Sequence, residues 1–383
     1  MYRSGLIGSV IVASLGCASP AFAQSNATSV YMPAVLELSG AGAVSGTNFR
    51  DGMLMAIDEI NAEGGILGKK INTPLLDTQS DAGVSRAQVQ KVLDNNPYVI
   101  FGPVYSGSVL VDLVLTAQAE VPEIVGGEAA AITQKDSAYV FRTSFGQQTS
   151  IPKIAAYIRD SVKAKTIGIV WVNNDFGKGG RDAFLKEMAA SNIKVVADVS
   201  TESGQTDFSA DVVKAKAANA DAMFVYLNEE ESARFLKEAK KQGLKGPLVG
   251  ETTLLGQKVI DLAEGAAEGA QGHVALTIDA PIPAVTQFAE RFKKRFNYLC
   301  DHNGIKGYTG VYFVKYVTET IGKFDSKEFA KAAHGITISP EQEPGILMDV
   351  TWNENGDIDR ASFLGEVVGG KQKIVKVLPK LNK

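Results

Sequence analysis

The chain has 383 residues and a formal net charge of -4, and 45% of its residues are hydrophobic. This length is long for one domain and sufficient for two domains, each with a core of its own. The acidic balance and the absence of a Lys/Arg-rich run from the sequence argue against nucleic acid as a partner, because phosphate binding needs a dense basic surface.

The first residues have the pattern of a secretory signal peptide. Arg3 precedes a short apolar run, and Ala21-Phe22-Ala23 is a cleavage pattern of small residues. We therefore expect residues 1–23 to be removed on export to the periplasm, with lipidation at Cys17 as the alternative. Export then leaves Cys300 as the single thiol of the sequence, so no internal disulfide is expected.

Short β-rich runs alternate with amphipathic helical patterns through most of the sequence. This alternation predicts parallel sheets covered by helices on both faces, and the units are too many for one sheet. The sequence therefore predicts an α/β protein with two doubly wound lobes. The predicted strands are 30–36, 71–76, 98–101, 123–125, 165–172, 195–199, 222–227 and 247–249. The predicted helices are 47–63, 85–93, 179–190, 211–218, 232–242 and 259–263.

The C-terminal part has a different pattern. It predicts helices over 285–296 and 309–321, followed by short antiparallel strands at 346–352, 363–368 and 374–377. Asn355-Gly356-Asp357 is a turn signal between two such strands. Because no flexible linker separates the lobes, we expect several ordered crossings between them.

Ser106 is a candidate for anion binding. It follows the predicted strand 98–101 and stands at the start of a helix, where backbone N–H groups and the positive end of the helix dipole favour an anion. The structural alternative is an N-cap serine.

No cofactor, metal or enzyme motif is present in the sequence. Gly40, Gly42 and Gly46 miss the dinucleotide-binding spacing, and His273 and His302 belong to a scattered set of histidines without metal-ligand spacing. We therefore expect neither catalysis nor a cofactor.

A series of motifs, in order along nearly the whole mature chain, resembles the leucine/isoleucine/valine-binding protein family. They include Leu38-Ser39-Gly40-Ala41-Gly42, residues 56–70, 102–108, Phe141-Arg142-Thr143, Asp175-Phe176-Gly177, Asp207-Phe208-Ser209, 241–244, Ala267-Glu268-Gly269 and 352–357. The resemblance implies two Rossmann-like lobes that close over a small-molecule ligand and deliver it to the permease subunits of an ABC importer.

The resemblance also implies three hinge crossings between the lobes, near 144–148, 276–280 and 348–352. The first lobe would comprise 24–145 and 278–350, and the second 146–277 and 351–383. The protein is expected to be a monomer. The disulfide usual in the first lobe is missing, because Ser80 and Tyr105 stand at the matching places.

Ligand contacts carried over from the family begin with Ser106, whose counterpart binds the ligand's carboxylate. The loop with Gly127, Glu128 and Ala129 would offer backbone groups, but the family's threonine hydroxyl is replaced by Ala129. The acidic residue that pairs with the ligand's ammonium is replaced by Thr252.

A desolvated ammonium without a carboxylate partner is costly, so these replacements argue against a standard α-amino acid. The expected ligand is an organic acid, aromatic or 2-oxo, with a branched-chain or other amino acid as the alternative. Glu128, Glu251 or the run 229–231 could still supply the missing charge, although such a run at a helix N-terminus usually faces water. Further expected contacts are Phe176, Asn228, Ser45 and the aromatic residues Tyr105, Tyr226 and Tyr308.

Two other function classes fit parts of the sequence. A sensor domain would use the same closure to signal to a partner protein. An exported oxidoreductase would use a Rossmann-like lobe to hold a nicotinamide cofactor, which saturable binding of that cofactor would reveal.

Overall fold

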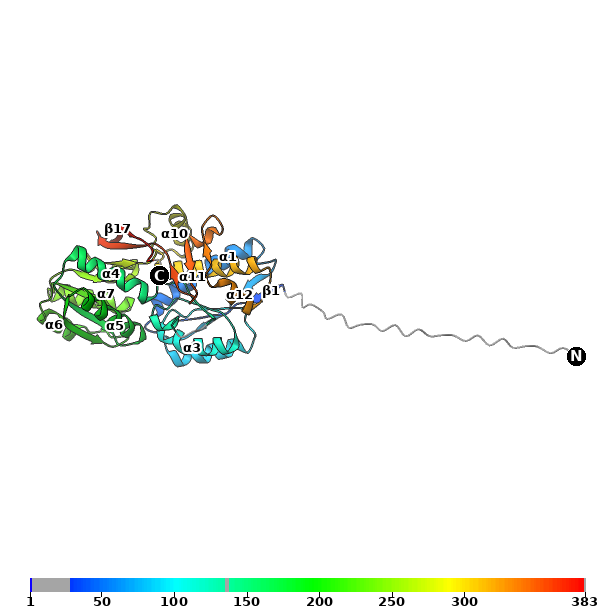
Figure 1. Ribbon diagram of the computed structural model, residues 1–383, viewed down its shortest axis with the longest axis horizontal. Coiled ribbons are helices and arrows are strands. Elements are labelled where there is room, and N and C mark those ends of the chain that lie inside the picture. Colours follow the sequence, from blue (N-terminus) through cyan, green and yellow to red (C-terminus); the bar gives the residue numbers. More distant parts are fainter. Residues whose placement is uncertain (2–27, 135–137, 382–383) are drawn as a thin grey trace.

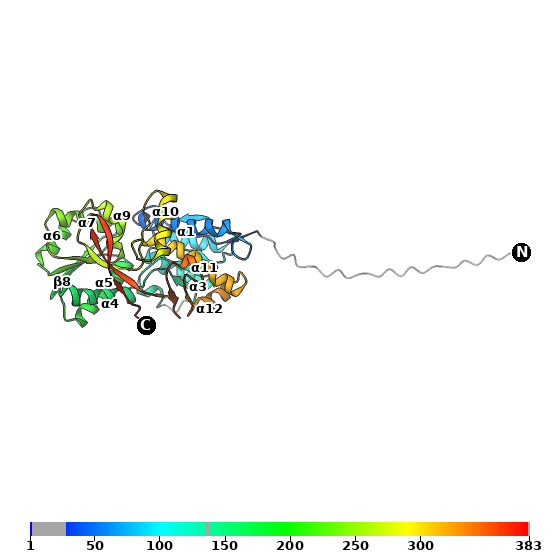
Figure 2. The same ribbon diagram turned by 90° about the horizontal axis from the view of Figure 1, so that it is seen from above.

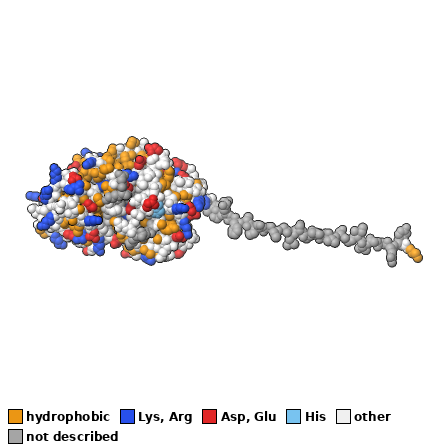
Figure 3. Space-filling view, in the orientation of Figure 1, with side chains coloured by type: hydrophobic (Ala, Val, Ile, Leu, Met, Phe, Trp, Pro, Cys, Tyr) orange, Lys and Arg blue, Asp and Glu red, His pale blue; other side chains and the backbone are white. Residues whose placement is uncertain are grey.

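The computed structural model describes residues 1, 28–134 and 138–381, so the predicted cleavage site and Cys17 lie outside the described residues. Two α/β lobes lie side by side (Figures 1 and 2), one with helices α4 to α7 and the other with α1, α3 and α10 to α12. Charged side chains of both signs are interspersed over the face shown in Figure 3.

The first lobe contains a parallel sheet in the order β4-β2-β5-β6-β7. The order along the chain reverses beside β2, which makes this sheet doubly wound. Its strands are β2 (Ala34–Leu36), β4 (Leu75–Asp77), β5 (Ile100–Phe101), β6 (Glu123–Val125) and β7 (Val140–Arg142). Its helices are α1 (Ala43–Ala62), α2 (Ala82–Leu93), α3 (Ser106–Ala119), α10 (Pro283–Phe296), α11 (His302–Ile321) and α12 (Ser326–Ala333).

Side chains of the first sheet alternate between two apolar layers. Leu36 and Phe101 join the core shared with α1 and α11, whereas Val35 and Ile100 pack with apolar residues of α2 and α3. Both faces of the sheet are thus covered by helices, as the sequence pattern predicts.

The second lobe contains a larger sheet in the order β17-β16-β12-β11-β10-β8-β9. The five strands that come first in the chain are parallel, and β16 and β17 add an antiparallel edge. The strands are β8 (Thr166–Val172), β9 (Lys194–Thr201), β10 (Ala222–Tyr226), β11 (Leu248–Gly250), β12 (Gln271–Val274), β16 (Ser362–Val368) and β17 (Lys371–Leu378). The helices are α4 (Gln147–Tyr157), α5 (Asp175–Ala190), α6 (Ser209–Ala217), α7 (Glu229–Lys241), α8 (Thr252–Leu255) and α9 (Gln257–Leu262).

Two predicted strands are each divided in the structure. The prediction at 30–36 becomes β1 (Ser29–Tyr31) and β2, and the prediction at 71–76 becomes β3 (Lys70–Asn72) and β4. β1 and β3 pair with each other in a separate two-stranded sheet. Pro33 and Pro74 lie at the breaks, and a proline has no N–H to continue a ladder of hydrogen bonds.

The predicted strand 346–352 is shorter than expected. A 3-10 turn at Pro344–Ile346 precedes β14 (Val350–Trp352), which pairs with β13 (Thr337–Ile338) and β15 (Ile358–Asp359). The predicted turn at 355–357 is confirmed, because Trp352 pairs with Ile358 and Gly356 between them has a φ of 77°.

The chain crosses between the lobes at 143–146, after β7, and at 275–282, after β12. The third crossing lies between β15 and β16, later than the predicted 348–352. The Trp352 ring stacks on Phe313 of α11 with 3.9 Å between centroids, and its Nε1 donates to the Arg142 carbonyl at 3.0 Å. These contacts keep 351–359 with the first lobe, whereas the sequence placed that segment in the second.

Candidate ligand-binding site

A cavity of about 210 Å³ lies between the lobes. Its walls come mainly from residues that follow β5 and β6 in the first lobe, residues that follow β8 and β10 in the second, and the start of α11. The carboxyl ends of both parallel sheets therefore face the cavity, next to the points where strand order reverses. This is where ligands bind in open α/β sheets.

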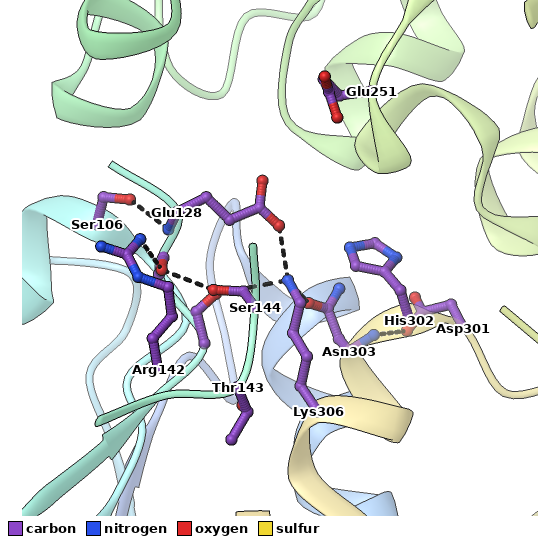
Figure 4. A network of polar contacts seen from close by, with 12 residues as sticks. Ser106, Glu128, Arg142, Thr143, Ser144, Glu251, Asp301, His302, Asn303 and Lys306 are labelled. Carbon is purple, nitrogen blue, oxygen red and sulfur yellow. Dashed lines mark hydrogen bonds and ion pairs between the residues drawn. The ribbon is translucent and has the colours of Figure 1, made fainter. Parts of the chain in front are cut away.

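Ser106 lies at the centre of a donor-rich corner of the cavity. Its Oγ accepts a hydrogen bond from the backbone N–H of Glu128 at 3.2 Å (Figure 4). It accepts a second one from the backbone N–H of Ala129 at 3.1 Å. A hydroxyl has two acceptor sites and one proton, so both acceptor sites are used and the proton is left for a ligand. Gly107 and Ser108 also line the cavity, and N–H groups in the first turn of a helix have no acceptor within the helix.

The N-cap alternative for Ser106 is wrong. Ser106 is the first residue of α3, and Tyr105 is the N-cap, without a side-chain cap. The hydroxyl therefore joins α3 to the loop after β6 rather than closing its own helix.

A buried carboxyl group that the sequence analysis missed also lies at this helix N-terminus. Glu37, just after β2, accepts hydrogen bonds from the N–H groups of Val104 and Tyr105, both at 3.0 Å. Burial raises the pKa of Glu37 to about 7. The protein thus covers part of the helix end with a weakly acidic group of its own.

Lys306 contributes a buried cation to the cavity wall. Its Nζ donates to Glu128 Oε1 at 2.7 Å, to Asn303 Oδ1 at 3.2 Å and to the Gly126 carbonyl at 3.4 Å, as Figure 4 shows in part. Lys306 does not stand out in the sequence, because the apolar pattern predicts a helix that starts only at 309. Asp301 could have revealed the earlier start, since its side chain caps α11 by accepting from the N–H groups of Asn303 and Gly304.

A hydrogen bond across the cavity joins the two lobes. Asn303 of the first lobe donates from Nδ2 to Glu229 Oε1 of the second lobe at 3.0 Å, and His302 Nε2 lies 3.8 Å from the same oxygen. Burial raises the pKa of Glu229. The interpretation of 229–231 as a run facing water is thus wrong for Glu229 and Glu231, which are buried. Glu229 lines the cavity, whereas Glu231 accepts hydrogen bonds from the N–H groups of Gly204 and Asn228.

Several polar atoms around the cavity are buried and lack a hydrogen-bond partner within the described residues. They are Tyr105 Oη, Asn228 Nδ2, Thr253 Oγ1 and both ring nitrogens of His302. Burial, together with the charge of Lys306, lowers the pKa of His302 well below its usual value, so the ring is neutral and offers one donor and one acceptor. Because buried polar groups in proteins are nearly always paired, these atoms mark places for ligand or water.

Phe176 forms an aromatic wall on the second lobe. Its ring stacks on Tyr226 with 4.3 Å between centroids. Gln147, next to the first crossing, donates from Nε2 to the Phe176 carbonyl at 2.7 Å and to Tyr226 Oη at 2.9 Å. Phe176 lines the cavity, whereas Tyr226 lies behind it in the core.

The structure brings together six of the ligand contacts expected from the sequence. Ser45, Tyr105, Ser106, Glu128, Phe176 and Asn228 line the cavity. Ser80, at the place of the missing disulfide, also lines it, and its Oγ accepts from the Gly42 N–H at 2.9 Å.

Four other expected ligand contacts do not belong to the cavity lining: Gly127, Ala129, Thr252 and Tyr308. The carbonyls of Gly127 and Ala129 accept from buried Arg142 at 2.9 and 3.1 Å. Thr253, the residue after Thr252, lines the cavity in its place. The Tyr308 hydroxyl donates a hydrogen bond to Glu59 at 2.7 Å.

Glu251, which could have replaced the missing acidic partner, is engaged elsewhere. Its Oε2 lies 2.7 Å from Nδ1 of His273, and both side chains are buried within the second lobe.

Within the described ranges, no group of three or more His, Cys, Asp or Glu side chains is placed to hold a metal ion. In the same part of the chain, no helix has the length and apolar character needed to cross a membrane.

Comparisons with known proteins agree with this architecture. A family model described as periplasmic binding protein matches residues 29–372. The Leu/Ile/Val-binding protein of Rhizobium johnstonii is 25% identical over 347 residues, which cover 90% of this chain and 93% of that protein.

Two solved structures share the fold. One is a branched-chain amino acid transporter substrate binding protein of Streptococcus pneumoniae in complex with isoleucine, with a TM-score of 0.81, 22% identity and coverage of 91% and 99% of the two chains. The other is an ABC transporter solute binding protein of R. palustris in complex with benzoate, with a TM-score of 0.84, 19% identity and coverage of 92% and 97%. The chain therefore belongs to the periplasmic binding protein family, and its likeness to a Leu/Ile/Val-binding protein confirms the resemblance carried by its motifs.

Proposed function

We propose that this protein is the exported solute-binding component of an ABC importer of the branched-chain amino acid type, and that it binds a small organic carboxylate between its lobes. The observation that carries the ligand class is the corner formed by Ser106 and the first turn of α3. There a hydroxyl proton and backbone N–H groups converge on the cavity. Such a donor set recognises an anion through charge-assisted hydrogen bonds.

The size and lining of the cavity support a ligand of the size of a small metabolite. Its volume of about 210 Å³ is below the roughly 300–1,000 Å³ typical of sites for drug-sized molecules. Phe176 offers an aromatic face. The unpartnered atoms of Tyr105, Asn228, Thr253 and His302 favour a ligand with a further neutral polar group, such as a hydroxyl or an oxo group.

An amino acid is the second candidate ligand. Glu128 and Glu229 place carboxyl groups at the cavity, and the Rhizobium relative is named for branched-chain amino acids. Both carboxyl groups, however, already have partners in this chain, Lys306 and Asn303 respectively. The benzoate complex of the R. palustris protein provides a precedent on this fold for a ligand without an ammonium group.

A ligand screen tests the proposal. The purified mature protein is heated with benzoate, 4-hydroxybenzoate, aromatic and branched 2-oxo acids, and the corresponding amino acids, and mass spectrometry identifies any ligand that copurifies from the periplasm. We expect organic acids to raise the melting temperature. Saturable binding of a nicotinamide cofactor, with no response to any acid or amino acid, would instead favour an exported oxidoreductase.

A further inference from the structure

The Lys306 ammonium has an acceptor for each of its three N–H groups. An ammonium has three N–H donors, and Lys306 has three acceptors: a carboxylate oxygen of Glu128, the amide oxygen of Asn303 and the carbonyl of Gly126. The Lys306 side chain is only 4% exposed. A carboxylate with neutral oxygens around it is also the set that the ammonium of an amino acid needs.

The same loop serves the carboxylate corner and the Lys306 ammonium. The N–H groups of Glu128 and Ala129 bond to Ser106, while the Glu128 carboxylate and the Gly126 carbonyl bond to Lys306. An α-amino acid carries its carboxylate and its ammonium on one carbon. With its carboxylate at Ser106, such a ligand would therefore direct its ammonium to oxygens that Lys306 already holds.

We propose that Lys306 is a specificity-determining residue that occupies the ammonium position from within the protein and so selects deaminated acids over amino acids. This inference rests on the proposed function and adds the residue that enforces the ligand class. An incoming ammonium would meet a like charge, and the Glu128 carboxylate would already be paired with that charge. The like-charge contact is the repulsive element that a selective site requires.

A purely structural role explains the pair less well. A buried ion pair is seldom more stabilising than apolar side chains of similar volume, so stability alone gives little reason for one in a cavity wall. Lys306 and Glu128 come from α11 and from the loop after β6, and both line the cavity. Their position in the cavity wall fits a role in recognition.

The test compares wild-type protein with Lys306→Met by isothermal titration calorimetry. The matched probes are phenylpyruvate with L-phenylalanine, and the 2-oxo acid of leucine with L-leucine. We expect the wild type to bind the acid of a pair at least about tenfold more tightly than the amino acid. In Lys306→Met, Glu128 is free to accept the ligand's ammonium, so this ratio should move at least about tenfold toward the amino acid, a change of about 1.4 kcal/mol.

The double variant Glu128→Gln/Lys306→Met is the matched control. It removes both charges, so it avoids leaving a buried carboxylate unpaired and should fold even where the single variant does not. We expect it to gain no affinity for the amino acids, so its acid-to-amino-acid ratio should stay on the acid side, unlike that of Lys306→Met. A wild type that prefers the amino acids, or a ratio equal in all three proteins, would overturn the role of Lys306. A wild type that binds no acid or amino acid at all would remove the proposed function, and this inference with it.

Discussion

At the scale of single residues, the Ser106 hydroxyl is the group that we propose to bind the ligand's carboxylate. Its two acceptor sites are filled by the N–H groups of Glu128 and Ala129, so its proton is left for the cavity. We expect Ser106→Ala to weaken binding of a carboxylate ligand by about 1.5–3 kcal/mol, the scale of one hydrogen bond to a charged group. Calorimetric titration with the best acid from the screen measures this loss.

Thr320→Ala is a suitable control for Ser106→Ala. Thr320 is an exposed residue of α11 outside the cavity lining, and its hydroxyl donates to the Tyr316 carbonyl at 2.8 Å. Its removal should leave ligand affinity unchanged. Equal losses in the two variants would argue that Ser106 acts through the stability of the fold and not through the ligand's carboxylate.

Glu37 predicts a pH dependence of folding stability. Its pKa is raised from an ordinary 4.5 to about 7 by burial, so the folded state holds the proton more tightly than the unfolded state. Its contribution to stability is therefore complete below about pH 4.5 and is lost as the pH rises to about 7. At 1.36 kcal/mol per pKa unit, the loss is about 3 kcal/mol.

Urea denaturation of wild type and Glu37→Gln at several pH values isolates this effect. Other titrating groups, including His302, are common to both proteins and cancel in the difference. The free energy of unfolding of wild type relative to the variant should fall between pH 4.5 and pH 7. A difference that stays constant over this interval would mean that Glu37 is already ionised in the folded protein at pH 4.5.

At the scale of elements, helix starts converge on the cavity. α3, α5, α7 and α11 all begin with residues of its lining: Ser106, Asp175, Glu229 and His302. Each helix start carries partial positive charge and N–H groups without acceptors in the helix. The polar character of the cavity thus comes from the way that the elements are arranged, besides individual side chains.

The starts of α7 and α11 carry the hydrogen bond between Asn303 and Glu229 that joins the lobes across the cavity. Asn303→Ala removes the 3.0 Å hydrogen bond to Glu229 across the cavity and leaves a buried carboxyl group without that donor. We expect the arrangement in which this hydrogen bond joins the lobes to become less stable by about 1–3 kcal/mol. Ligand affinity should fall by the corresponding factor. Small-angle X-ray scattering should show a larger radius of gyration for the ligand-free variant than for wild type.

Asn95→Ala, at an exposed position beyond the C-terminal end of α2, is the control for Asn303→Ala. It should leave both affinity and radius of gyration unchanged. If Asn303→Ala lowers affinity without altering the scattering, the asparagine acts on the ligand or on Lys306 and not on the open–closed equilibrium.

At the scale of the whole molecule, a ligand held between two lobes stabilises both of them. Because the unfolded chain has no cavity, ligand at 100 times its Kd should raise the free energy of unfolding by about 2.7 kcal/mol. Denaturation with increasing ligand measures this, and the increment should follow the logarithm of ligand concentration. An increment that saturates early would indicate that the unfolded chain also binds the ligand.

Much of this molecule is determined by local sequence patterns. The alternation of buried strands with amphipathic helices predicts two doubly wound lobes, because hydrophobic periodicity is a property of neighbouring residues. Ser106, Phe176 and Asn228 could be identified for a related reason. Each follows a strand of a parallel sheet, and the carboxyl ends of such strands meet at the ligand edge.

Only the tertiary structure determines which charged side chains face the cavity and how they are paired. The paired groups lie far apart in the sequence, so no local pattern connects them. The separation is 178 positions for Lys306 and Glu128, 74 positions for Asn303 and Glu229, and 67 positions for Glu37 and Val104. A hydrogen bond or ion pair depends on side-chain positions within a few ångströms, and these are set only when helices from separate parts of the chain pack together. For this reason the sequence determined the lobes and the ligand edge, whereas the packing of α11 and α7 decided which charges a ligand meets there.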